Sequence, residues 1–258
     1  MTMEAPDATT LPGWLDNLRR KAEDDGWTTT IWGEIASLPL LALTRSARCT
    51  EAPRVYLSAG IHGDESAGPL AVDRLITTGV LSRAVHWTVV PLLNPIGWIR
   101  RTRENAAGVD LNRDYQFMKQ PETRGHAAFL RDRPPNDLFL SLHEDWEVSG
   151  FYLYELNGSK YPSIGTAILR AVESIVPLAS EPTIDDHTLA EPGWIRHPVD
   201  PDEPEKWPEA IFHQRQYPHL SYTFETPSSQ FPIERRVDAH ATGVDAALRE
   251  FLRASTSQ

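Results

Sequence analysis

Residues 54–68 read RVYLSAGIHGDESAG, and this stretch indicates how the chain is built. Its first part, RVYLSAG, is a short apolar run of the kind that forms a buried strand. A polar turn around Gly63 follows, and apolar residues then recur at helical spacing from Glu65 to Thr78. A strand that leads through a turn into a helix is the repeating unit of an α/β protein.

The same alternation continues along the chain. Six other runs are apolar and strand-like: 28–35, 38–44, 85–93, 137–143, 150–156 and 220–225. Three stretches begin with proline, which suits the first turn of a helix, and look helical: 121–131, 162–174 and 232–253. Several strand runs are too uniformly apolar for a sheet with one face in water. We therefore predict an α/β/α sandwich with a mixed, mainly parallel central sheet.

Two segments interrupt this alternation. Residues 94–120 are polar and rich in arginine, and residues 177–218 contain eight prolines and much charge. Both are long for loops without secondary structure, and such loops are usually functional or disordered. Because no internal repeat or linker-like composition is present, we predict one domain over residues 1–258.

Composition argues against several classes of function. The chain has 258 residues, enough to bury a full core, and its single cysteine excludes an internal disulfide. A net charge of −11 disfavours nucleic acid and anionic membranes as partners. No run of about 18 apolar residues and no secretory signal is visible. We expect a cytoplasmic protein with neither a nucleic-acid nor a membrane partner.

Chemically active side chains occur where strand-like runs end. His62 and Glu65 follow the strand of the opening stretch, and His143 and Glu225 end two later runs. Ligands of open α/β sheets bind at the carboxyl ends of the strands, so these four residues are expected at one edge. A catalytic zinc ion takes three protein ligands and leaves one position for water. Two histidines and Glu65 could supply those ligands, which leaves Glu225 as a general base.

Each of these residues also has an ordinary structural interpretation. His62 and Glu65 could be a surface pair, His143 a core histidine bonded to backbone, and Glu225 a salt-bridge partner. Their coincidence at one predicted edge gives the metal site about the same weight as these alternatives.

An arginine-rich loop follows Asn94. Its arginines are Arg100, Arg101, Arg103 and Arg113. Guanidinium groups bind carboxylates and stabilise developing oxyanions. A solvated basic loop explains the same pattern equally well.

Five motifs resemble those of the zinc metallocarboxypeptidases, the carboxypeptidase A-like family. They are GIHGDESAG (60–68), NPIGWIRRTR (94–103), GVDLNRDY (108–115), LSLHEDWE (140–147) and YTFETPS (222–228). They occur in the family's order over about two thirds of the chain. The chain is similar especially to short bacterial members that resemble murein peptide amidase. It also resembles the related aspartoacylase and succinylglutamate desuccinylase branch.

The resemblance implies a metal site and a catalytic carboxylate. One zinc ion would be held by His62, Glu65 and His143. Glu225 would be the catalytic glutamate. Asp110 would orient a zinc-bound imidazole, a contact that ligating histidines usually make.

The resemblance also implies how a substrate is held. Arg100, the first arginine of the RRTR run, would polarise the scissile carbonyl. Asn112 and Arg113, together with Arg103, would bind the substrate and its terminal carboxylate. The segment 177–218 should build the substrate-facing pocket, although it matches no known specificity class.

Two features depart from the family pattern. Family peptidases commonly carry a tyrosine in a mobile loop before the catalytic glutamate, and neither Tyr217 nor Tyr222 aligns with it. We interpret Tyr222 as a core residue of its strand. The acids after His143, namely Glu144, Asp145 and Glu147, could favour a cationic substrate or support a ligand, but we favour a solvated acidic turn.

The resemblance leaves two activities open. The first is zinc-dependent hydrolysis of an amide bond next to a free carboxylate, in which Glu225 activates the water and a C-terminal residue leaves a small peptide. The second is deacylation of an N-acyl amino acid. The NPIGW stretch favours the peptidase. A catalytically inactive metal-binding domain is disfavoured because the ligand set is complete.

Overall fold

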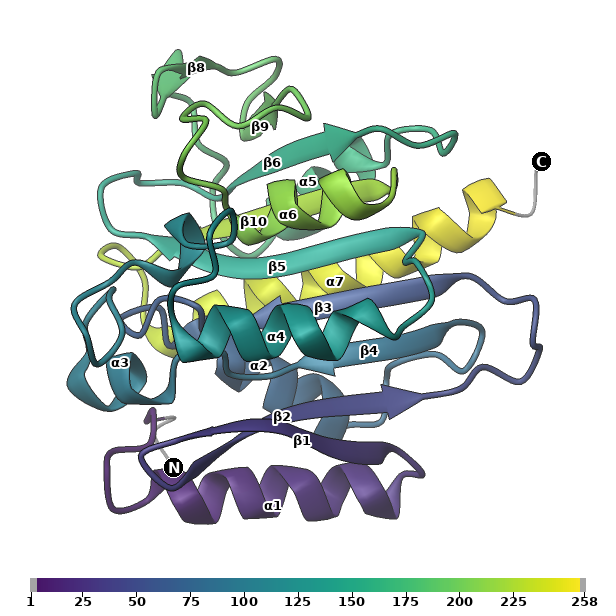
Figure 1. Cartoon of the computed structure of the whole chain (residues 1–258). Helices are drawn as coiled ribbons and strands as arrows, with labels where there is room; N and C mark the ends of the chain where they lie inside the picture. Colours follow the sequence, from purple (N-terminus) through teal and green to yellow (C-terminus); the bar gives the residue numbers. More distant parts are fainter. Residues whose placement is uncertain (1–3, 256–258) are drawn as a thin grey trace.

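The computed structural model describes residues 4–255, and a β-sheet forms the centre of this part of the chain (Figure 1). The strands of the sheet are β1 Thr28–Ile35, β2 Leu38–Arg45, β3 Arg54–Ala59, β4 His86–Val90, β5 Leu138–Asp145, β6 Tyr152–Asn157, β9 Trp194–Arg196 and β10 Leu220–Pro227. Their order across the sheet is β1-β2-β4-β3-β5-β10-β6-β9. Two short strands, β7 Thr183–Ile184 and β8 His187–Thr188, pair with each other outside it.

Helices cover both faces of the sheet, as Figure 1 shows. On one face lie α1 Leu11–Asp24, α2 Ala67–Thr77, α5 Gly165–Val172 and α7 Ile233–Ser255. On the other face lie α4 Pro121–Arg131 and α6 Glu209–Gln216. The short helix α3 Pro95–Arg100 and a 3₁₀ turn at Leu111–Arg113 lie in the loop between β4 and α4. The predicted α/β/α arrangement is therefore confirmed.

The sheet is mixed, as predicted, and its middle is parallel. The neighbours β4, β3, β5 and β10 all run in the same direction. The hairpin β1–β2 and strand β6 join this middle part in antiparallel pairs. Because the parallel strands share one direction, their carboxyl ends meet at one edge, and residues from distant parts of the chain come together there.

The middle strands are buried because both of their faces are covered. In β3, Val55 and Leu57 pack in the core that includes α2 and α7, whereas Tyr56 packs in the smaller core with residues of α4 and α6. Alternate side chains of a strand point to opposite faces, so an apolar run without polar interruptions suits this position. The apolar stripe expected near the C-terminus is buried: Val237, Val244, Leu248 and Phe251 all lie in the larger core.

Three helices, α1, α3 and α6, were not expected from the sequence. The stripe of α1 is present in the sequence, since Leu11, Leu15, Leu18 and Ala22 are buried at helical spacing. Helix α6 lies inside the proline-rich segment and shows no stripe, because its first six residues are all buried. A helix that is covered on every side lacks the periodicity that reveals a surface helix. Within residues 4–255, none of the helices has the length and apolar character needed to span a bilayer.

Candidate metal centre

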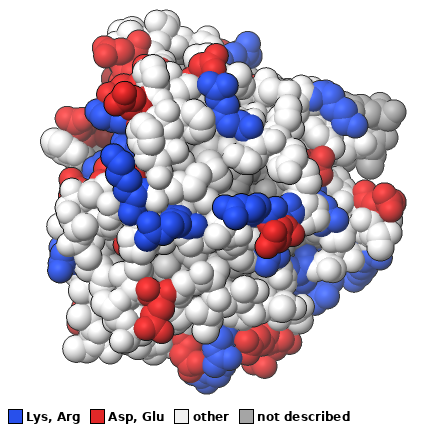
Figure 2. Space-filling model, in the orientation of Figure 1, with Lys and Arg blue, Asp and Glu red and all other residues white. Residues whose placement is uncertain are grey.

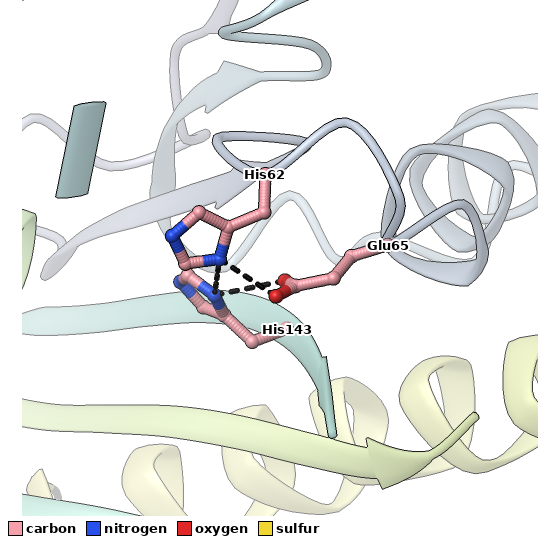
Figure 3. Close-up of side chains that lie close together, drawn as sticks. All are labelled: His62, Glu65 and His143. Atoms are coloured by element: carbon pink, nitrogen blue, oxygen red, sulfur yellow. Dashed lines mark hydrogen bonds and ion pairs between the residues drawn. The ribbon is translucent and has the colours of Figure 1, made fainter. Parts of the chain in front are cut away.

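The edge where β3 and β5 end brings His62, Glu65 and His143 together (Figure 3). His62 and Glu65 lie in the turn between β3 and α2, and His143 lies near the end of β5. The turn depends on two glycines. Gly60 has a φ of +66°, and a Cβ on Gly63 would lie 1.9 Å from the carbonyl carbon of Gly97. The turn is thereby fixed against α3, in a conformation that bulkier residues do not fit.

The three side chains present converging donor atoms. His62 Nδ1 lies 2.6 Å from Glu65 Oε1, and His143 Nδ1 lies 3.0 Å from Glu65 Oε2. The two Nδ1 atoms are 3.3 Å apart, and all three residues are buried. Ligands about 2.0 Å from a tetrahedral zinc ion stand about 3.3 Å from one another. Two imidazole nitrogens so close need a proton or a cation between them, so this donor set fits a zinc ion.

Asp110 lies behind His62. Its Oδ1 accepts from His62 Nε2 at 3.1 Å, which leaves Nδ1 facing the other two donors. Burial lowers the pKa of His62, but the Glu65 carboxylate and the bond to Asp110 outweigh it and raise that pKa to about 9. Asp110 also accepts from Arg103 Nε at 3.0 Å. The contact that the resemblance implied for Asp110 is therefore present.

Glu225 lies beside the three donors on β10. It is in register with His143 of β5 on one side and with Tyr152 of β6 on the other. Burial raises the pKa of Glu225 well above its ordinary value; the nearby His143 opposes this and Glu65 adds to it. Glu225 and the three donors line one cavity of about 470 Å³.

The structure corrects the prediction for Arg100. Helix α3 ends at Arg100, and the next residue, Arg101, has a φ of +56° that reverses the chain. Arg100 is exposed, lies outside the residues that line the cavity, and has its guanidinium 3.4 Å from the carbonyl oxygen of Ala106. Arg103, beyond the reversal, lines the cavity, and its Nη1 lies 3.6 Å from Glu65 Oε1. Arg103 is thus the arginine of the RRTR run that reaches the site.

Asn112 and Arg113 also line the cavity. The 3₁₀ turn that carries them starts at Asp110, whose side chain accepts from Asn112 N at 2.8 Å. Asn112 Oδ1 in turn accepts from the backbone N–H of Glu209 at 2.8 Å. Arg113 is exposed, so its guanidinium is available to a ligand in the cavity.

Two of the three acids after His143 differ from the solvated turn that we expected, whereas Glu147 is exposed as expected. Glu144 is buried; it accepts from the backbone N–H of Ala67 at 2.7 Å and forms an ion pair with Arg236. It is a structural link between β5, α2 and α7. Asp145 accepts a hydrogen bond from the Tyr152 hydroxyl at 2.8 Å.

The two tyrosines before Glu225 lie away from the cavity. The Tyr222 hydroxyl is buried and donates to Glu155 at 2.7 Å, so the core interpretation is confirmed. Tyr217 is exposed and lines a different cavity beside α4 and α6. Neither supplies a hydroxyl to the metal donors.

The sequence analysis did not identify several residues that line the cavity, among them Tyr152, Tyr154, His187 and His197. The two tyrosines are two residues apart in a strand, so their side chains point to the same face of the sheet. This spacing is visible in the sequence and could have identified them. The two histidines lie in the segment expected to build the pocket, and the structure confirms that this segment forms one wall of the cavity.

Known proteins share this fold and parts of this sequence. The family model of the succinylglutamate desuccinylase/aspartoacylase catalytic domain matches residues 51–174. Carboxypeptidase SOL1 of Arabidopsis thaliana is 34% identical over 101 residues, which is 31% of this chain and 21% of that protein.

Two solved structures extend the likeness to nearly the whole chain. A protein from Shewanella amazonensis assigned to the metallopeptidases has a TM-score of 0.81 and 24% identity, over 97% of this chain and 99% of that one. A metallo-carboxypeptidase from Burkholderia cenocepacia has a TM-score of 0.68 and 19% identity, over 95% of this chain and 69% of that one.

The chain therefore has the fold of these two solved structures, and its residues 51–174 are similar to the succinylglutamate desuccinylase/aspartoacylase catalytic domain. These similarities agree with the resemblance of the sequence to the zinc carboxypeptidases and to the succinylglutamate desuccinylase/aspartoacylase branch.

Proposed function

We propose that this protein hydrolyses an amide bond next to a free carboxylate and so removes the C-terminal residue of a small peptide. One observation carries the proposal. A single cavity is lined by the three converging donors, the Glu225 carboxylate and the Arg113 guanidinium. These are the groups that such a reaction needs: a metal site, a base and an anchor for the substrate carboxylate.

The metal would be held by His62, Glu65 and His143. A zinc ion there would lower the pKa of a bound water from about 16 toward about 7 and would polarise the scissile carbonyl. Asp110 keeps the His62 ring in the orientation that turns its Nδ1 toward the other donors.

Glu225 would act as the general base. It takes a proton from the attacking water and then gives it to the nitrogen of the leaving amine. The register of β10 with β5 sets Glu225 next to His143, so strand pairing fixes the base beside the metal donors.

The arginines would divide two tasks between them. Arg103 is fixed by Asp110 close to the donors and would stabilise the negative charge that develops on the carbonyl oxygen. Asn112 and Arg113 would bind the terminal carboxylate of the substrate, with the planar guanidinium forming paired hydrogen bonds.

A second candidate is deacylation of an N-acyl amino acid. The match of residues 51–174 to the succinylglutamate desuccinylase/aspartoacylase model favours it. The metal donors, Glu225 and Arg113 would serve that reaction in the same way, because its substrate also carries a carboxylate beside an amide.

Two substrate sets distinguish these functions. Zinc-loaded protein is incubated with short peptides that have free or amidated C-termini, and with N-acetyl and N-succinyl amino acids, and products are identified by mass spectrometry. We expect release of a C-terminal residue only from peptides with a free C-terminus. Cleavage of only the acylated amino acids would assign the second function. Glu225→Gln is the control, which should retain zinc and lose about 10² to 10⁴ in rate; near-normal turnover by this variant would refute the mechanism.

A further inference from the structure

A second group of metal-type donors lies in the far wall of the same cavity. His187 in β8, and His197 and Asp202 in the loop after β9, bring their ligand atoms within 4.8 Å of one another. We call these three residues the wall cluster. They come from the proline-rich segment, and no residue of the first donor set belongs to the cluster.

The distances in the wall cluster match those of the first donor set. His187 Nε2 lies 3.2 Å and His197 Nε2 lies 3.1 Å from the same atom, Asp202 Oδ2. The corresponding separations in the first set run from 2.6 to 3.3 Å. Ligands of a tetrahedral zinc ion stand about 3.3 Å apart. Two imidazoles that converge on one carboxylate oxygen therefore already have the spacing of metal ligands.

The tautomer of His197 suits metal binding. Its Nδ1 lies 2.6 Å from the carbonyl oxygen of Pro198, which can only accept a hydrogen bond. Nδ1 therefore carries the proton, and in the neutral ring Nε2 presents a lone pair toward Asp202. Two acceptors facing each other at 3.1 Å repel unless a cation lies between them. Ligating histidines usually donate their second nitrogen to an acceptor in this way.

The surrounding residues hold both rings in place. Tyr154 meets the rings of His187 and His197 edge to face, at centroid distances of 5.9 and 6.0 Å, and its hydroxyl donates to Asp185 at 2.8 Å. The His197 side chain is only 9% exposed. The two rings therefore keep much of their arrangement without a ligand, which lowers the entropic cost of binding one.

The charge around the wall cluster attracts cations. Between residues 183 and 206 the sequence has seven acidic and two basic residues. Figure 2 shows acidic side chains gathered at the upper left of the molecule, over the part that Figure 1 labels β8. Such a field raises the local concentration of divalent cations.

We propose that His187, His197 and Asp202 bind a second divalent transition metal ion of the zinc class, separate from the ion at His62, Glu65 and His143. Two imidazoles and one carboxylate are ligands that zinc, copper and nickel share, whereas calcium and magnesium prefer oxygen alone. The ion joins the β7–β8 hairpin to the loop after β9 and so fixes one wall of the cavity.

Metal content tests this proposal. Protein freed of metal is equilibrated with buffered Zn²⁺, and bound zinc is counted by native mass spectrometry. We expect two ions in the wild type and one in Asp202→Asn or His197→Gln. Asp200→Asn is the matched control, because Asp200 is an exposed acid of the same loop that pairs with Arg215; it should keep two ions. One ion in the wild type, or two in Asp202→Asn, would overturn the second site.

Proteolysis reports whether this ion fixes the wall. Arg196 and Lys206 are exposed, so trypsin can attack the segment on both sides of Asp202. Zinc at about ten times its dissociation constant should slow this cleavage by about tenfold in the wild type, and should not slow it in Asp202→Asn. Equal protection of both proteins would overturn the proposed role of the ion. Hydrolysis measured on the same samples is a separate readout: lack of activity with two ions bound would refute the proposed function and leave this site standing.

Discussion

Arg100 and Arg103 are separated by two residues but have different surroundings. Arg101 adopts a left-handed conformation and reverses the chain, so Arg100 faces solvent while Arg103 turns back to Asp110 and Glu65. Spacing along the sequence does not encode this reversal, which depends on how α3 packs against the turn that holds Gly63. The sequence therefore predicted that an arginine of this run reaches the site, and in the structure the one that lines the cavity is Arg103, not Arg100.

This geometry gives a prediction for the two arginines. Arg103→Ala should lower kcat by about 10² to 10³, the usual cost of losing one group that stabilises an oxyanion. Arg100→Ala is the matched control. It should leave kcat and KM within about twofold of wild type, because Arg100 is exposed and does not line the cavity. Steady-state kinetics on zinc-loaded proteins measure both. A large loss in Arg100→Ala alone would restore the assignment made from the sequence.

His126 is a buried histidine whose two ring nitrogens are both occupied. The Tyr56 hydroxyl donates to Glu209, so it accepts from His126 Nε2 at 2.8 Å, and Nδ1 accepts from the Tyr115 hydroxyl at 2.7 Å. Burial lowers the pKa of His126 to about 3, and the neutral ring is the form that the fold holds.

This burial should make the protein sensitive to acid. The unfolded chain takes up a proton on His126 below a pH of about 6.5, whereas the folded chain does so only near 3, so stability falls as the pH drops through this window. The contribution of His126 to that slope is at most about 1.4 kcal/mol per pH unit. Urea unfolding at several pH values should show a flatter dependence for His126→Gln, although this variant is less stable at pH 7. If the free energy of unfolding changes with pH in the same way for both proteins, His126 is not a source of the acid sensitivity.

At the scale of elements, the turn between β3 and α2 decides the metal site. It carries His62 and Glu65 and packs so closely on α3 that Gly63 has no room for a side chain. The spacing of HGDE in the sequence is local and could be recognised directly. The residue on which this turn packs, Gly97, lies 34 residues further along the chain, so this contact could not be recognised from the motif.

Gly63→Ala should therefore damage both stability and metal binding. The new methyl group would lie 1.9 Å from a backbone carbon of Gly97, so the turn or α3 must move. We expect a loss of about 1 to 3 kcal/mol, as for other overpacked sites, together with weaker zinc binding. The control is Gly13→Ala in α1, where a Cβ meets nothing within 4 Å and alanine should stabilise the helix by up to about 1 kcal/mol. Thermal unfolding and zinc titration measure these effects, and normal zinc binding by Gly63→Ala would contradict the expectation.

At the scale of the whole molecule, one buried ion pair links the end of the chain to the site. Arg236 of α7 pairs with Glu144 of β5, and the same carboxylate caps the start of α2 through Ala67 N. Burial raises the pKa of Glu144, and Arg236 opposes that rise. The counter-ion of Glu144 thus comes from a residue about 90 positions further along the chain, and the pair lies directly beside the metal donor His143.

Removing one partner of this pair should be more harmful than removing both. Arg236→Met leaves a buried carboxylate without its counter-ion and should cost about 3 to 5 kcal/mol. The double variant Arg236→Met, Glu144→Gln should recover part of that loss, because a neutral amide still accepts from Ala67 N. Chemical denaturation of the wild type, the single variants and the double variant completes the cycle. A double variant whose loss equals the sum of the two single losses would mean that the two residues are not coupled.

The sequence by itself determined where the long strands and four of the helices lie along the chain, and the edge at which His62, Glu65, His143 and Glu225 meet. These features are local: they follow from apolar periodicity and from which residue ends a strand. Only the tertiary structure decided that Arg103, and not Arg100, lines the cavity, that Glu144 is buried, and that two histidines of the proline-rich segment lie together with Asp202. Each of these depends on where a loop or a helix returns after many residues, and the side-chain pattern of one segment carries no information about the path of another.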